Sequence, residues 1–84
     1  MTQLSCSVKN GMFSHERVVS FVDSAGEENA VFVDAKHIVH EESGDWLRVK
    51  PILETPERFM VSLPTADGDR VWVETKSLRQ TVPA

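Results

Sequence analysis

The stretch VFVDAKHI, residues 31–38, is followed forty positions later by VWVETKSL, residues 71–78. In both stretches two valines flank an aromatic residue, an acidic residue follows, and a lysine comes three positions after the second valine. Alternation of apolar side chains with a period of two is typical of a β-strand with one buried face. The two stretches therefore predict two corresponding strands, each followed by a single short turn.

The match extends to either side of these strands and indicates an internal duplication. The identical pairs at an offset of 41 residues are Val8/Val49, Lys9/Lys50, Glu16/Glu57 and Arg17/Arg58, and one additional residue in the second half then aligns Ser20-Phe21 with Ser62-Leu63. At the offset of 41, Cys6 corresponds to Leu47, which favours a small buried side chain at Cys6 over a reactive thiol. We expect a first repeat over about residues 4–40 and a second over about residues 46–80.

Each half of the chain reads as three short strands. In the second half, for example, Phe59, Val61 and Leu63 form an apolar face with a period of two. The Asp67-Gly68 pair is a strong hairpin signal, because glycine accepts a positive φ at little cost. Residues 24–28 form a longer turn, and residues 40–45 read as a polar, acidic connection between the halves. The prediction is an all-β fold with about six strands and at most short 3₁₀ turns. We expect these strands to form a small, partly open barrel.

Composition limits the classes of protein. The 84 residues make a single domain, 1–84, and 40% hydrophobic with 26% charged residues is ordinary for a globular chain. The net charge of -4 argues against a protein whose main partner is the phosphate backbone of a nucleic acid. One cysteine permits no internal disulfide, and no apolar stretch approaches the length of a membrane span. We expect a cytoplasmic protein without membrane association.

The end of the chain resembles a known family of folds. Val71-Trp72-Val73, the turn Thr75-Lys76-Ser77 and then Leu78 are similar to the last strands of SH3-like barrels, where one 3₁₀ turn joins two strands. The resemblance implies a small barrel. The acidic loop and paired tryptophans of the peptide-binding SH3 domains are absent, so their proline-motif binding residues are not carried over to this chain.

The histidines and the cysteine are the candidate metal ligands and the candidate nucleophile. His37 and His40 stand three apart beside Glu41 and Glu42, whereas a zinc site needs three or four converging donors. They fall on a strand exit and turn, and the second half has other residues in their places. Cys6 is the one thiol, and a nucleophile needs a base within hydrogen-bond reach. We expect no catalytic site, no metal site and no cofactor.

Basic residues support an alternative function. Those that the alignment duplicates or adds on the same strands are Lys9, Lys50, Arg17, Arg58 and Arg48. Cations on one surface, with aromatic rings for stacking, would favour binding of nucleic acid. Glutamates adjoin both duplicated arginines, and ion pairs on a solvated face account for the same pattern.

Aromatic side chains favour a different function. If the flanking valines point inward, Phe32 and Trp72 point outward. Exposed apolar patches commonly mark contacts with other proteins. The hypothesis is a non-catalytic interaction module that uses Phe32, Trp72 and Trp46 to bind a protein partner or a second copy of itself. The alternative for Phe32 and Trp72 is a second minor core, covered by a crossing strand or a terminal segment.

Overall fold

The computed structural model describes residues 1–80, and this part of the chain is all-β. Two 3₁₀ turns, η1 (Ala35–His37) and η2 (Thr75–Ser77), are its helical segments. Its eight strands are β1 (Thr2–Asn10), β2 (Glu16–Val22), β3 (Glu28–Asp34), β4 (Ile38–Glu41), β5 (Gly44–Glu54), β6 (Arg58–Ser62), β7 (Arg70–Glu74) and β8 (Leu78–Gln80).

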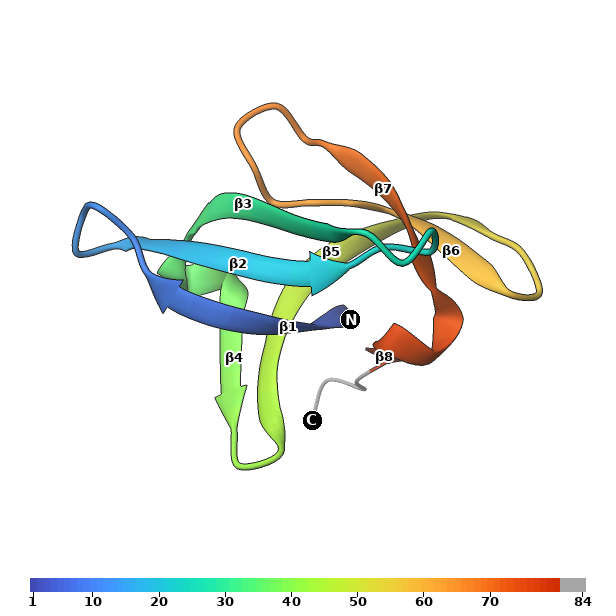
Figure 1. The fold of residues 1–84 in the computed structure, drawn as a ribbon, viewed down its shortest axis with the longest axis horizontal. Helices are drawn as coiled ribbons and strands as arrows, with labels where there is room; N and C mark the ends of the chain where they lie inside the picture. The colour runs from blue at the N-terminus through green and yellow to red at the C-terminus, as the bar shows by residue number, and fades with distance from the viewer. Residues whose placement is uncertain (81–84) are drawn as a thin grey trace.

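Six of the strands form one antiparallel path in the order β3-β2-β1-β5-β6-β7, which curls into a half-barrel (Figure 1). Two short strands lie off this path: β4 pairs with β5, and β8 pairs with β1. The prediction of six strands is therefore too low by two. The missed strands have four and three residues, too few to show an alternating pattern.

The polar, acidic connection predicted for residues 40–45 is the turn of a tight hairpin between β4 and β5. In this hairpin His40 pairs with Asp45 and Glu41 pairs with Gly44. Gly44 has a φ of 139°, which lies in a region that favours glycine. The hairpin projects from the body of the sheet, while the β1–β2 and β5–β6 turns lie at opposite ends of the long axis (Figure 1).

The turns within each half have the chemistry that the sequence predicted. The β2–β3 turn has Gly26 at a φ of 81°, and the carboxylate of Asp23 accepts hydrogen bonds from two backbone N–H groups of the turn. The β6–β7 turn has Gly68 at a φ of 62°, and the hydroxyl of Thr65 accepts a hydrogen bond from the N–H of Asp69. Glycine takes these positive φ values without a Cβ clash, so both turns stay tight.

The core lies on the concave face of the curled sheet. Its buried members are Leu4, Val19, Phe21, Val33, Ile38, Leu47, Val49, Val61, Leu63 and Val73. The predicted inward valines of β3 and β7 are confirmed, with Val33 and Val73 buried and Val31 and Val71 packed against the core.

Strand pairing corrects the alignment of the two halves by one residue. Phe32 pairs with Val18 in the β2–β3 hairpin, and Trp72 pairs with Met60 in the β6–β7 hairpin. Two pairs further along, Glu16 faces Asp34 and Arg58 faces Glu74. Arg58 thus holds the place that Glu16 holds in the other hairpin. Arg17 and Arg58 are identical in the alignment of letters, but they do not occupy matching positions in the two hairpins.

Strand pairing also changes which residues of β1 and β5 match each other. Leu4 pairs with Leu78 of β8, and Leu47 pairs with Ile38 of β4, so Leu4 corresponds to Leu47. Cys6 pairs with Asp45 instead. An irregularity between Pro51 and Leu53 shifts the register of β5 against β6, which an alignment of letters does not reveal.

Candidate interaction surface

The three aromatic residues singled out from the sequence lie in different surroundings. Phe32 has 63% of its surface exposed, whereas Trp72 and Trp46 are both half-buried. Each tryptophan has an arginine guanidinium against its ring. Only the Phe32 ring presents its apolar surface openly to solvent.

Trp72 is covered from its own hairpin. The guanidinium carbon of Arg58 lies 4.4 Å from the centre of the indole ring, which is a cation–π contact. The alternation of β6 places Arg58 on the same face as Met60, the direct partner of Trp72. The backbone N–H of Ser24 also donates a 2.8 Å hydrogen bond to the carbonyl oxygen of Trp72, so a turn from the other half closes on this strand.

Trp46 belongs to a small polar cluster on the convex face of β1 and β5. The guanidinium carbon of Arg79 lies 4.0 Å from the centre of its ring. Arg79 also donates to both carboxylate oxygens of Glu41, at 2.6 and 2.9 Å, and to the side-chain oxygen of Gln3 at 2.7 Å. The hydrogen bond from Arg79 lowers the pKa of Glu41, and the reciprocal bond raises the pKa of Arg79. These contacts cover the ring of Trp46 with polar side chains from β1, β4 and β8.

The indole N–H of Trp46 is buried and has no hydrogen-bond partner among residues 1–80. An unpaired buried donor costs free energy. Because the atom has almost no accessible surface, it offers nothing for a ligand to bind.

Phe32 has apolar and aromatic residues near it on β2 and in the β1–β2 connection. Val18 pairs with it on β2, and His15 lines the same cleft as Phe32. The ring of Phe13 stacks on that of His15, with 6.0 Å between the ring centres. Phe13 itself is 58% exposed. We call these four residues the Phe32 surface.

Sequence reasoning found one of the four members of the Phe32 surface. Phe13 and His15 lie in the β1–β2 connection, and Ala35 donates a backbone hydrogen bond to the carbonyl oxygen of His15. That bond holds the connection against the end of β3. A bulky apolar residue such as Phe13 in a turn was an available signal.

The predicted basic residues do not form one surface. Arg17 pairs with the buried Val33 and donates to the carbonyl oxygens of Ser14 and Glu16, both at 2.8 Å. Arg17 therefore lies on the same face of the sheet as the buried Val33. Arg58 lies against Trp72, on the outward face.

The remaining predicted cations are exposed on β1 and β5. Arg48 makes a long contact of 3.4 Å with the carbonyl oxygen of Lys36, and Lys9 and Lys50 are exposed on their strands. Pairing places Lys50 opposite Ser62 and Lys9 opposite Val18, so the two lysines hold different places in their hairpins.

His37 and His40 lie in different elements, η1 and β4. His40 contacts the carboxylate of Asp45 across the β4–β5 hairpin at 2.6 Å, and His37 is in η1. Within residues 1–80, no group of three His, Cys, Asp or Glu side chains is placed to hold a metal ion.

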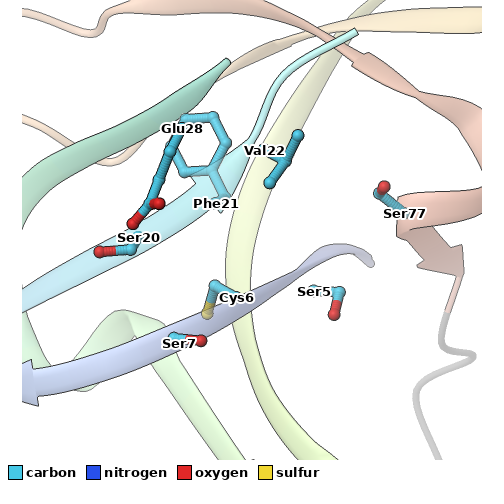
Figure 2. Close-up of a pocket in the computed structure, with 8 residues that line it drawn as sticks. All are labelled: Ser5, Cys6, Ser7, Ser20, Phe21, Val22, Glu28 and Ser77. Carbon is cyan, nitrogen blue, oxygen red and sulfur yellow. The ribbon is translucent and has the colours of Figure 1, made fainter. Parts of the chain in front are cut away.

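Cys6 lines an open surface pocket of about 400 Å³ between β1, β2, the start of β3 and η2 (Figure 2). The thiol is half-buried, less than predicted. Burial, and then the charge of Asp45, raises the pKa of Cys6 to about 11. A thiol with so high a pKa is protonated at neutral pH and is a poor nucleophile. The neighbours that Figure 2 labels are mainly serines, with no histidine among them.

Residues 1–80 contain no helix that is long and apolar enough to cross a lipid bilayer. Comparison of the chain with protein-family models, with curated proteins and with solved structures finds no match in any of the three.

Proposed function

We propose that this protein is a non-catalytic interaction module that binds a protein partner through the Phe32 surface. The observation that carries the proposal is that Phe32 is 63% exposed, whereas Trp72, the residue in the matching position of β7, is covered by Arg58. Leaving an aromatic ring in water gains nothing for folding, whereas aromatic side chains supply much of the binding energy at protein interfaces.

The difference between the two hairpins has a chemical origin. Glu16 holds the place of Arg58, and a carboxylate does not stack on an aromatic ring as a guanidinium does. The carboxylate of Glu16 accepts a hydrogen bond from the N–H of Met12 at 3.0 Å instead. Glu16 thus fixes the β1–β2 turn, and the ring of Phe32 stays uncovered.

We test this by affinity capture from a lysate of cells that express the protein, carried out with and without nuclease. The wild-type chain is compared with Phe32→Ser and with the control Leu53→Ser. Leu53 is 53% exposed on a different hairpin, so its replacement removes a similar apolar area elsewhere. Wild type and Leu53→Ser should retain the same partner, and Phe32→Ser should lose it.

Nucleic-acid binding is the alternative outcome of this experiment. Material that disappears on nuclease treatment, depends on Lys9 and Lys50, and survives Phe32→Ser would replace the proposal with a nucleic-acid role. The affinity for a generic oligonucleotide should then fall steeply with salt. We expect no such binding at physiological salt.

We also propose that the halves are two copies of one β-β-β-3₁₀-β unit related by a rotation near 180°. Supporting this, both halves have the same order of elements, and the last strand of each pairs with the first strand of the other. The ending β7-η2-β8 retains the strand, 3₁₀ turn and strand of SH3-like barrels, and we propose a relation at the level of fold. An experimental structure in which β2–β4 do not superpose on β6–β8 would contradict the duplication.

A further inference from the structure

The half-barrel of residues 1–80 has two edge strands, β3 and β7, and the edge of β7 is closed by another part of the chain. On β7, the N–H of Ser24 donates to the carbonyl oxygen of Trp72 at 2.8 Å. Ser24 lies two residues before Gly26 in the β2–β3 turn, so that turn fastens onto the edge of β7. Closing an edge in this way removes backbone groups that could otherwise pair with another chain.

The corresponding edge on β3 is open. Ala66 lies two residues before Gly68, as Ser24 does before Gly26, yet among residues 1–80 no backbone hydrogen bond joins Ala66 to Phe32. Phe32, Pro64 and Ala66 line a cleft of about 380 Å³ instead. Pro64 has no N–H to donate across it.

The backbone of β3 faces this cleft. Phe32 holds the place in its hairpin that Trp72 holds in the other, and the carbonyl of Trp72 points away from β6 toward Ser24. In an antiparallel pair the N–H and C=O of one residue point to the same side. Phe32 and Ala30, two residues before it, therefore direct both groups outward. An exposed edge of this kind is where an extended peptide adds as a further strand.

The charge beside the cleft specifies the chemistry of the added strand. Glu16 and Asp34 both line the cleft and face each other directly across β2 and β3. The two carboxylates accept separate backbone N–H bonds, from Met12 and Lys36, and together they make this end of the cleft negative, so that it attracts a cation. No lysine or arginine is among the residues that line the cleft, whereas the corresponding pair on the closed side is Arg58 and Glu74.

We propose that the edge of β3 binds an extended segment of a partner protein as an added strand. An apolar side chain of that segment lies against Phe32, and a lysine or arginine lies beside Glu16 and Asp34. This inference rests on the proposed function and names the partner's chemistry. A second copy of this chain fits less well, because its own β3 carries a carboxylate at each end, Glu28 and Asp34, and the chain has a net charge of -4.

The probe is a library of random nine-residue peptides displayed on phage and selected on the folded full-length protein. Selected peptides should combine a lysine or arginine with β-branched or aromatic residues in alternation. Synthetic copies should bind at least ten-fold more weakly to Ala30→Pro, which removes an outward N–H, and to the double variant Glu16→Gln/Asp34→Asn. Both replaced carboxylates cap backbone N–H groups, and the amide oxygens of the variant can still do so.

Controls separate folding from binding. Ala30→Lys keeps the strand and adds a cation at the edge, so it should also weaken binding if Ala30→Pro fails to fold. Arg70→Gln on the other edge strand should leave binding unchanged. The inference is overturned if no peptide is enriched, if the enriched peptides are acidic, or if edge variants bind them as wild type does. A dimer in sedimentation that Ala30→Pro dissociates would overturn it in favour of a second copy.

Failure of this inference differs from failure of the proposed function. If Phe32→Ser loses the captured partner while Ala30→Pro retains it, the Phe32 surface binds but the edge of β3 does not. If both variants retain the partner, the proposed function itself is wrong.

Discussion

Leu4 of β1 pairs directly with Leu47 of β5, and both side chains are fully buried. The pair joins the two halves of the chain, because Leu78 of β8 also faces Leu4 and Ile38 of β4 also faces Leu47. Four apolar residues from four strands thus meet at this junction of the two halves. The junction lies at the middle of the strand path, where β1 pairs with β5.

Leu47→Ala should lower the free energy of unfolding by about 2–5 kcal/mol, because it leaves a cavity at this junction. A domain of this size has only about 5–10 kcal/mol of stability, so the variant should be close to unfolding. Urea denaturation measures the change. Leu53→Ala, at an exposed position, is the control and should change stability by less than about 0.5 kcal/mol. Equal effects would contradict the described core.

The outward aromatics should differ in what they contribute to stability. Phe32→Ala should cost less than about 0.5 kcal/mol, since the ring is largely in water already. Trp72→Ala should cost about 1–3 kcal/mol, because it removes a half-buried ring and the contact with Arg58. Val73→Ala should cost about 1–3 kcal/mol from the core. Thermal unfolding of the three variants tests the order, and a larger loss for Phe32→Ala than for Trp72→Ala would reverse it.

Acid should weaken the contact between Glu41 and Arg79. The hydrogen bond from Arg79 holds the pKa of Glu41 below its ordinary value of 4.5. A carboxyl group with a lowered pKa stabilises the folded state above its unfolded pKa, and that contribution is lost as the pH falls through the folded pKa. Wild type should therefore exceed Glu41→Gln in melting temperature at pH 7, and the difference should shrink below pH 4.5.

The matched control for the acid experiment is Glu42→Gln, which changes the neighbouring exposed carboxylate in the β4–β5 turn. Its melting temperature should follow that of wild type through the same pH range. A difference between wild type and Glu41→Gln that grows in acid would show that Arg79 does not hold the carboxylate in solution.

Cys6 should react slowly with iodoacetamide in the folded protein. Its pKa of about 11 against an ordinary 9.0 leaves about 100-fold less thiolate at pH 8. Mass spectrometry of the labelled chain, with and without 6 M guanidinium, measures the rate. Labelling of the folded protein at the unfolded rate would mean that the thiol is not held in the surroundings described for it.

Much of the fold could be read from local pattern. The alternation at Val31/Val33 and Val71/Val73 places these side chains on one face whatever the rest of the chain does, because successive residues of a strand point to opposite sides. The Asp67-Gly68 turn was equally local, since a glycine there needs only its own φ. These features identified an all-β chain and most of its core.

The candidate surface could be predicted only in part. The sequence marked Phe32 and Trp72 as equivalent outward aromatics, and the structure leaves Phe32 exposed while Arg58 covers Trp72. What covers a ring depends on residues far along the chain, such as Arg79, which reaches Gln3 and Trp46 from the last described strand. Glu16 and Arg58 looked unrelated in the alignment, and only strand pairing showed that they hold the same place.

By itself, then, the sequence determined the longer strands and which face of each is apolar, because both follow from a backbone period of two and from turn glycines that accept a positive φ. Only the tertiary structure decided that β4 pairs with β5 and β8 with β1, and that the edge of β7 is closed while the edge of β3 is open. The physical reason is range. Strand period is set within a few residues, whereas register, covering contacts and edge closure are set by the packing of segments distant in the chain.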